Sequence, residues 1–507
     1  MSNADQLSPQ TAPRSRRRLG VPSVVFMIIA ASAPLTVAAG GFPTSLAVTQ
    51  NQGIPLAYLL VGLVLVVWSV GYAAMSRHIT NAGAFYSYIS QGIGRPIGVG
   101  ASVVALIAYN SFVVGIYGLF GFQISSLLSQ WLGWQLAWWI PVLIGIALVA
   151  ILGVNQVDLS AKVLGVLLCL EFVIVVIFDV TSFAVAPEGV SAAPFAPSTL
   201  FVAGFGAVLA FSIAAFAGFE GAAIYGEESK DPKHTVARAT YIAVGIIALF
   251  YSLSAWAMIV GFGPSSIIDN ATSEGAGLLF GFLGSHLGVV VTDLANVLFV
   301  TSLFAALTSF HNAVARYFFS LGREGVLPSS LAKVNRRGAP YVGSLLQTGI
   351  AIVVTVIFAI IGANWVPPEG LPAELFPVVT MFSWLTNNGG LGLVLLMAIV
   401  SIAVVGFFAK NQRDATLWQR AIAPIIAAVA LLGIFVFVIA NFNVLLTSDP
   451  TAPPTAATFV LPAIAIVPGI IAAIWGLYLR NARPQVYSQI GHGTEGAGAP
   501  QLAATED

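Results

Sequence analysis

Residues 33–43 read Ala-Pro-Leu-Thr-Val-Ala-Ala-Gly-Gly-Phe-Pro and lie within the first long apolar segment of the chain. Four residues of this stretch disfavour a regular helix, namely Pro34, Gly40, Gly41 and Pro43. Proline has no backbone N–H and glycine adopts unusual backbone angles, so the segment is predicted to be an interrupted helix. Interrupted backbone at membrane depth is tolerated only where it is buried in protein or lines a cavity.

The composition of the whole chain indicates a protein that crosses a membrane many times. Of its 507 residues, 58% are apolar and only 8% are charged, and the mean hydropathy is +0.92. Soluble domains carry about 25% charged residues. The 20 basic and 20 acidic residues balance, so no net charge points to a nucleic-acid partner. A single cysteine, Cys169, excludes an internal disulfide framework.

Twelve segments are apolar and long enough to cross the hydrocarbon layer, which is about 30 Å thick, as helices. They run approximately over 24–47, 53–75, 97–122, 137–154, 163–185, 200–225, 239–262, 285–318, 342–363, 376–408, 422–442 and 458–479. We expect an all-α polytopic membrane protein with a transmembrane domain over 21–480. Its predicted parts are helices 1–5 (21–186), helices 6–10 (200–408) and helices 11–12 (422–480), flanked by a retained N-terminal tail (1–20) and a disordered C-terminal tail (481–507).

The charges support this division. With both termini inside, all 20 lysines and arginines fall in the predicted cytoplasmic segments, as the positive-inside rule requires. The predicted outer loops carry only acids, namely Glu188, Asp269, Glu274, Glu369, Glu374 and Asp449. We therefore expect a multi-pass protein of the cell membrane with both termini in the cytoplasm.

The sixth apolar segment contains Gly218 and Gly221, five helices after the first interruption. Interrupted helices at corresponding positions of two halves are a sequence pointer to a transporter site. The pairing predicts that helices 1–5 and 6–10 form inverted repeats, with two helices appended. Ordinary close packing of helices through small residues is the alternative explanation.

Five stretches carry a resemblance to a known family. They are Arg316–Pro328 (RYFFSLGREGVLP), Asn335–Pro340 (NRRGAP), Gly218–Glu220 (GFE), Glu227–Pro232 (EESKDP) and Asn81–Tyr88 (NAGAFYSY). Together they resemble the amino acid-polyamine-organocation superfamily. The resemblance implies the leucine-transporter fold, in which helices 1 and 6 unwind around a central substrate that is exposed to each side of the membrane in turn.

The resemblance also implies which residues bind the substrate, and two departures bear on it. The usual glycine-rich break of helix 1 is replaced by residues 33–41, where Pro34 has no N–H to donate to a carboxylate. Many members also carry a lysine in helix 5 where this chain has Glu171. The candidate substrate-binding residues are Ala33, Pro34, Thr36, Ala38 and Gly40 in helix 1, and Phe216, Gly218 and Phe219 in helix 6.

Ionisable residues inside a membrane cost roughly 3 kcal/mol or more, so each is a functional hypothesis. Burial disfavours the charged form of Glu171, which could then take up and release a proton; a structural, hydrogen-bonded carboxyl is the alternative. Glu220, beside the helix 6 break, is a gating residue by resemblance, or else a cap on the broken helix. Asp179 and Asp293 lie nearer the outer ends and are expected to reach the interface.

A sodium site is a further possibility, because Ser302, Thr308 and Ser309 of helix 8 offer oxygen ligands. Hydroxyls that bond to their own helix would explain these residues equally well. The five histidines make no metal pattern, and no nucleotide-binding or hydrolase motif is present, so we expect no metal, no cofactor and no enzymatic activity.

The sequence therefore predicts a secondary active transporter that imports an amino acid or related organic amine by symport, with H⁺ favoured as the coupling ion and Na⁺ possible. Two alternatives stay open. One is a polyamine or alkylamine permease, and the other is a transport-inactive membrane sensor of such a ligand. The expected partners are the small-molecule substrate and the lipid bilayer, with no nucleic acid, and the protein is expected to be a monomer or a homodimer.

Overall fold

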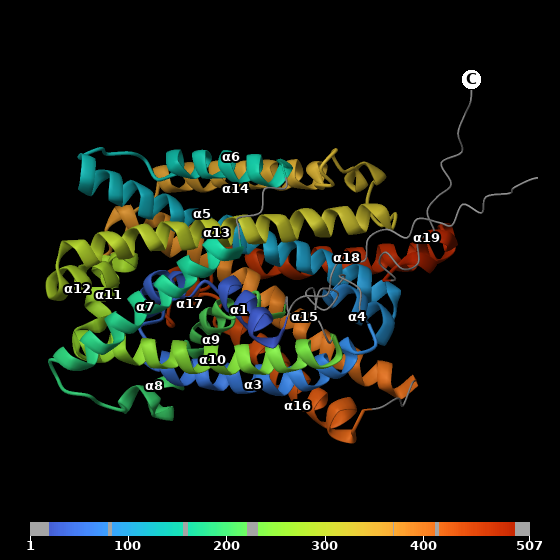
Figure 1. Ribbon diagram of the computed structural model, residues 1–507, viewed down its shortest axis with the longest axis horizontal. Coiled ribbons are helices and arrows are strands. Elements are labelled where there is room, and N and C mark those ends of the chain that lie inside the picture. Colours follow the sequence, from blue (N-terminus) through green and yellow to red (C-terminus); the bar gives the residue numbers. More distant parts are fainter. Residues whose placement is uncertain are drawn as a thin grey trace, which may run out of the picture.

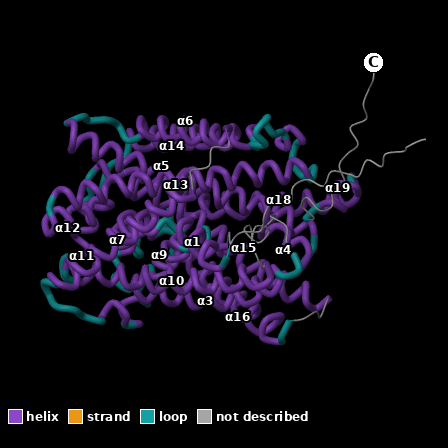
Figure 2. Tube along the Cα trace, in the orientation of Figure 1, coloured by secondary structure: helices purple, strands orange, loops and turns teal. Residues whose placement is uncertain are grey.

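The computed structural model describes residues 20–79, 84–155, 161–220, 232–368, 370–410 and 415–491. The described chain is helical, with loops gathered mainly at the two ends of the bundle and no strand among these residues (Figure 2). Ten of the described helices are long and apolar enough to cross a membrane. They are Val21–Thr49, Ile54–Ser76, Arg95–Leu132, Gly165–Val185, His234–Phe262, Val289–Arg323, Tyr341–Ala363, Ala373–Lys410, Trp418–Ala440 and Ala456–Ala482.

These ten helices coincide with ten of the twelve predicted spans, and shorter apolar helices occupy the other two positions. The fourth predicted span is α6 (Trp139–Asn155) and the sixth is α9 (Phe205–Ala215). The remaining helices used below are α1 (Val21–Ala31), α2 (Phe42–Thr49), α3 (Ile54–Ser76), α4 (Ala84–Gly92), α5 (Arg95–Leu132), α7 (Ala161–Val185), α10 (Pro232–Phe262), α11 (Ile267–Glu274), α12 (Leu278–Leu287), α13 (Val289–Arg323), α14 (Tyr341–Ala363), α15 (Ser383–Lys410), α16 (Ala423–Ala440), α18 (Ala456–Ala482) and α19 (Pro484–Gln489).

The long helices lie side by side along the longest axis of the molecule, with α1 and α9 near its centre (Figure 1). Helix α3 packs on α10, α6 packs on α14, and α5 runs through the interior against α13, α15 and α18. Of the most apolar stretch of α5, 78% is buried inside the protein, whereas the corresponding share is only 22% in α14 and in α18. The apolar faces of α14 and α18 therefore point away from the protein interior, as expected for lipid-facing helices.

The first helix is interrupted, but earlier than the glycines predicted. Helix α1 ends at Ala31, Ala33 adopts a φ of +46°, and the helix resumes at Pro34. Proline suits this first position because its fixed φ is helical and its missing N–H would have no helical partner there. Gly40 and Gly41 lie instead within a π-helix (Thr36–Gly41) that leads into α2. They belong to the resumed helix, so the prediction that they break it is wrong.

The second interruption follows α9 and touches the first. Gly218 has a φ of +103°, which L side chains rarely adopt. A Cβ at Gly218 would lie 2.9 Å from the Cβ of Ala31, the last residue of α1. The backbone of one break therefore packs directly against the end of the other, and a side chain at Gly218 would require the two to shift apart. Gly221 lies outside the described residues.

The C-terminal region differs from the expected tail over residues 481–491, which the structure describes as part of the fold. Helix α18 extends to Ala482 and α19 follows it. The side chain of Ile490 is buried, and the Gly491 N–H donates to the Tyr86 hydroxyl at 3.1 Å. Residues 492–507 and 1–19 lie outside the described part of the chain.

Candidate functional site

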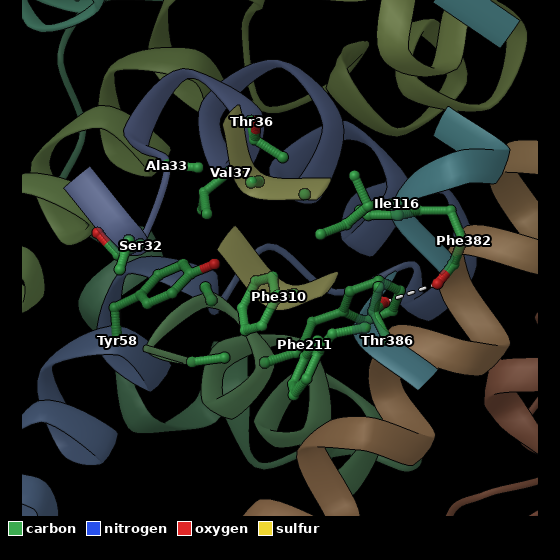
Figure 3. Close-up of a pocket in the computed structure, with 17 residues that line it drawn as sticks. Ser32, Ala33, Thr36, Val37, Tyr58, Ile116, Phe211, Phe310, Phe382 and Thr386 are labelled. Atoms are coloured by element: carbon green, nitrogen blue, oxygen red, sulfur yellow. Dashed lines mark hydrogen bonds between the residues drawn. The ribbon is translucent and has the colours of Figure 1, made fainter. Parts of the chain in front are cut away.

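A cavity lies where the two interrupted helices meet. Its empty space, counted together with the open space at its mouth, is about 560 Å³. Its wall comes from α1 and the resumed first helix, from α9, and from facing positions of α3, α5, α13 and α15 (Figure 3). The lining residues are Ala31, Ser32, Ala33, Thr36, Val37, Gly41, Tyr58, Phe112, Ile116, Phe211, Ala214, Ala215, Ala217, Ala306, Phe310, Phe382 and Thr386.

The wall of this cavity is mostly apolar and aromatic. The rings of Phe112 and Phe310 stack with centroids 5.5 Å apart and an interplanar angle of 18°. The Thr386 hydroxyl is turned to its own helix, where it donates to the Phe382 carbonyl at 2.6 Å (Figure 3). Among the described residues, no charged side chain lines the cavity. The site therefore suits a ligand whose side chain carries no charge.

Two helix ends supply polarity that the side chains do not. Helices α1 and α9 both finish at the cavity, with Ala31 and Ala215 as their last residues. The C-terminal end of a helix carries a partial negative charge from its unpaired carbonyls. Two such ends converging on one cavity favour a single cationic group, such as an ammonium, between them.

The candidate substrate-binding residues are distributed between this cavity and the packing around it. Ala33 and Thr36 line the cavity, whereas Pro34, Ala38 and Gly40 are not among its lining residues. Phe216 is buried with its ring 6.3 Å from those of Tyr58 and Tyr251. Phe219 packs edge-on to Trp68, with 5.4 Å between centroids, and Gly218 contacts Ala31. The helix 6 residues thus support the wall from behind.

No sequence pattern indicates the aromatic residues that line the cavity, which are Tyr58, Phe112, Phe211, Phe310 and Phe382. The chain has 33 phenylalanines, and no motif marks these four. Of these, Phe310 has the clearest sequence signal, because it directly follows Thr308 and Ser309, two of the predicted ion ligands.

Glu171 is joined to the cavity by two hydroxyl groups. Its side chain is 5% exposed, and its Oε2 atom accepts a hydrogen bond from the Ser302 hydroxyl at 2.8 Å. The Ser302 oxygen lies 3.2 Å from the hydroxyl of Thr36, which lines the cavity. The backbone of Leu35, in the resumed first helix, also lies near the carboxyl group. Within the described chain no lysine, arginine or histidine pairs with Glu171.

Glu220 is held differently, in a closed set of donors behind the helix 6 break. The Tyr109 hydroxyl donates to Oε1 at 2.6 Å and the Gly218 N–H donates to Oε2 at 2.9 Å. The Glu220 carbonyl accepts from the Tyr72 hydroxyl at 2.7 Å. The carboxyl group therefore fixes the shape of the broken helix. Its link to the cavity is indirect, through the Tyr109 ring, which lies 6.1 Å from that of Phe310.

The other polar candidates are less suited to an ion site. Thr308 donates to the Phe304 carbonyl of its own helix at 2.9 Å, and Ser309 is exposed. Asp293 is half-buried and accepts from Trp131 at 3.1 Å. Asp179 is only 4% exposed, so the expectation that it reaches the interface is wrong.

The fold and the site together define a class of membrane transporter. The crystal structure of MhsT in complex with L-phenylalanine aligns with a TM-score of 0.54 at 16% identity, over 82% of this chain and 98% of that chain. That likeness gives the leucine-transporter fold. The amino acid permease family matches residues 19–471. The chain belongs to this family, within the amino acid-polyamine-organocation superfamily, and it is a multi-pass membrane transporter of amino acids and not an enzyme.

Several permeases are similar over most of their length. The branched-chain amino acid permease BcaP of Lactococcus lactis is 28% identical over 61% of this chain and 69% of its own length. The gamma-aminobutyric acid permease of Escherichia coli is 26% identical over 62% and 68%. The lysine-specific permease LysP of Escherichia coli is 23% identical over 75% and 76%.

Proposed function

We propose that this protein imports a neutral amino acid with an apolar or aromatic side chain, together with a proton carried by Glu171. The observation that carries the proposal is the chain of groups that runs from the cavity through Thr36 and Ser302 to the Glu171 carboxyl. A buried carboxyl without a cationic partner takes up a proton at modest cost, because burial disfavours its charged form.

The hydroxyl chain offers a physical basis for coupling, since each hydroxyl has only one proton to donate. When Glu171 is ionised, Ser302 donates to it and Thr36 donates to Ser302, so Thr36 turns only lone pairs toward the cavity. When Glu171 is protonated, it donates to Ser302 and Ser302 donates to Thr36. Thr36 is then free to donate to a substrate carboxylate. Protonation and carboxylate binding therefore favour each other, and linkage makes the effect reciprocal.

The cavity favours one class of substrate among those of the similar permeases. The converging ends of α1 and α9 suit one ammonium group, and the aromatic wall suits an apolar side chain. A second positive charge, as in lysine or a polyamine, would lie against apolar side chains with no acid to pair with. Branched-chain and aromatic amino acids, the substrates named for BcaP and for the similar aromatic transport protein AroP, fit better.

The proposed direction of transport rests on the charges of the loops, which favour both termini in the cytoplasm. The proposed membrane is the cell membrane. In this orientation α7 ends, at Val185, on the outer side of the membrane. Proton entry from outside then drives substrate inward.

The test is uptake into proteoliposomes under an imposed inward proton gradient. One set receives pooled labelled neutral amino acids and the other receives pooled amines including putrescine. The proposal expects accumulation of the amino acid pool only, with leucine or phenylalanine as the best competitors. Accumulation of the amines, or accumulation that requires a sodium gradient and ignores the proton gradient, would contradict it.

A further inference from the structure

Helix α7 carries a second buried carboxyl group that the coupling chain above does not use. Asp179 lies eight residues after Glu171, which is about 12 Å further along the helix. Its side chain is 4% exposed and Glu171 is 5% exposed, so both acids lie on the buried side of α7. Burial of an acid at this depth is costly and calls for a function.

The contacts of Asp179 leave half of its carboxyl group unsatisfied. Its Oδ2 atom accepts from the Ser254 hydroxyl of α10 at 2.7 Å. Its Oδ1 atom is buried and has no hydrogen-bond partner among the described residues. The hydroxyl of Ser182, one turn nearer the end of α7, is likewise buried without a partner there. Buried polar atoms of this kind normally have a partner, so these two mark a place for water or a proton.

No charge on the neighbouring helices compensates Asp179. Helix α1 has no titratable residue, and the titratable residue of α10 nearest to Ser254 is Tyr251, one turn earlier. On the other two neighbouring helices the nearest titratable residues are the exposed His286 of α12 and the half-buried Asp293 of α13. In the described structure none of these groups is hydrogen-bonded to Asp179, and Ser254 is the only side chain bonded to it. A structural ion pair therefore does not explain the burial of this acid.

Helix α10 connects the two acids of α7. Ser254 contacts Asp179, and Tyr251 lies three residues earlier on the same helix. The Tyr251 hydroxyl donates to the Ser32 carbonyl at 3.0 Å, at the helix 1 break, and lies close enough to Glu171 to interact with it electrostatically. Three residues span about 4.5 Å along a helix, and water molecules bridge polar groups that lie too far apart for a direct hydrogen bond.

We propose that Asp179 is the outer proton-collecting residue, which takes a proton from the external solution and passes it inward along the α7–α10 interface to Glu171. The proton binds at Oδ1, the carboxyl group rotates so that this oxygen donates to the Ser254 hydroxyl, and Ser254 in turn gives its own proton to bridging water and the Tyr251 hydroxyl. Asp179 then returns to its ionised state. The route starts outside the substrate cavity at Asp179 and meets the cavity wall only at its inner end, where Tyr251 contacts Ser32. The inference rests on the proposed proton coupling and orientation.

The test replaces the carboxyl group while keeping its hydrogen bond. In Asp179→Asn the amide oxygen still accepts from Ser254, but it cannot carry a proton. Proteoliposomes with an internal pH dye report acidification on addition of substrate, and counterflow of labelled substrate reports movement that needs no net proton transfer. We expect acidification to slow by about tenfold or more, as for other lost proton-transfer groups, with counterflow within about twofold of the wild type.

Two variants serve as controls. Asp179→Glu keeps the carboxyl group and should retain most of the acidification rate. Asp293→Asn removes a carboxyl group near the same end of the bundle but outside the route, and it should behave as the wild type. If Asp179→Asn does not reach the membrane, Ser254→Ala takes its place, with slowed acidification and normal counterflow expected.

Wild-type acidification in Asp179→Asn would overturn the inference, and so would an equal loss of acidification and counterflow, which indicates a structural role. Absence of acidification in the wild type would instead refute the proposed proton coupling. Loss of acidification in Glu171→Gln but not in Asp179→Asn would leave the proposed function standing and remove only the route through Asp179.

Discussion

The two acids beside the helix breaks, Glu171 and Glu220, are both buried, but their hydrogen-bond partners differ. Glu220 receives two close donors, Tyr109 and the Gly218 N–H, and its own carbonyl is bonded as well. Glu171 receives one close donor, Ser302, and that hydroxyl has a second polar neighbour in Thr36. A carboxyl group whose oxygens both accept from fixed donors stabilises one conformation of the backbone around it. One that shares a rotatable hydroxyl can change state while its neighbours rearrange.

The difference assigns separate tasks to the two breaks. The helix 6 break is fixed by Glu220 and by the close packing of Gly218 on Ala31. The helix 1 break offers its Thr36 hydroxyl to the cavity and to the chain that leads to Glu171. Substitutions at the helix 6 break should therefore damage the whole transport cycle. Substitutions at the helix 1 break should instead uncouple proton transfer from substrate transport.

The largest expected difference lies in Glu171→Gln. One pH unit is worth about 1.4 kcal/mol per proton, so an imposed gradient of about two units drives roughly 100-fold accumulation in the wild type. The variant cannot carry the proton and should reach only the external concentration, while counterflow stays within about threefold of the wild type. Labelled uptake in proteoliposomes measures both. Uphill accumulation that persists in this variant would remove Glu171 from the coupling step.

Glu220→Gln should lower accumulation and counterflow together, by about tenfold each. An amide can accept from Tyr109, but its NH₂ group then faces the Gly218 N–H, and a mismatched buried pair costs about 1–3 kcal/mol. Thermal unfolding in detergent should show the loss of stability. A selective loss of accumulation with normal counterflow would mean that Glu220, too, carries a proton.

Thr36→Val removes the hydroxyl that faces the cavity and keeps the shape of the side chain. Loss of one hydrogen bond to a substrate carboxylate, worth about 1.5 kcal/mol, should raise the KM for import roughly tenfold. The dependence of substrate affinity on pH should also weaken. Thr36→Ser keeps the hydroxyl and should behave as the wild type. An unchanged KM in Thr36→Val would place the carboxylate elsewhere in the cavity.

The smallest expected effect is that of Gly218→Ala. Alanine at a positive φ costs about 1–2 kcal/mol, and its Cβ would press on Ala31. Transport should fall a few-fold, and the melting temperature should drop. Gly245→Ala is the matched control, because a Cβ at Gly245 in α10 meets nothing within 4 Å. Equal melting temperatures of the two variants would show that the contact between the breaks is unimportant.

The sequence predicts the helices of this fold well, because length and hydropathy are sufficient to recognise membrane spans. It also predicts that the first and sixth helices are interrupted. It misplaces the first interruption, since Gly40 and Gly41 serve another purpose: a Cβ at Gly40 would overlap with Leu119 of α5. Glycine permits a break and also permits close packing, and only the structure distinguishes the two uses.

The candidate site is predicted less completely. A helix that is apolar all round gives no periodicity from which to read its inward face, and α5, which supplies Phe112 and Ile116 to the cavity, is of this kind. The two acids stand out because a charge in an apolar segment is conspicuous whatever its rotation. The position of Asp179 near the end of its helix predicts exposure, whereas its contact with Ser254 of α10 buries it.

The central claim is that substrate binding and protonation of Glu171 are linked. The most direct measurement is the proton uptake of purified protein when saturating leucine or phenylalanine is added in weakly buffered solution at several pH values. The account predicts uptake of up to about one proton per bound substrate in the wild type, and none in Glu171→Gln, which should still bind substrate. Equal proton uptake by the two proteins, or none in the wild type at any pH, would contradict it.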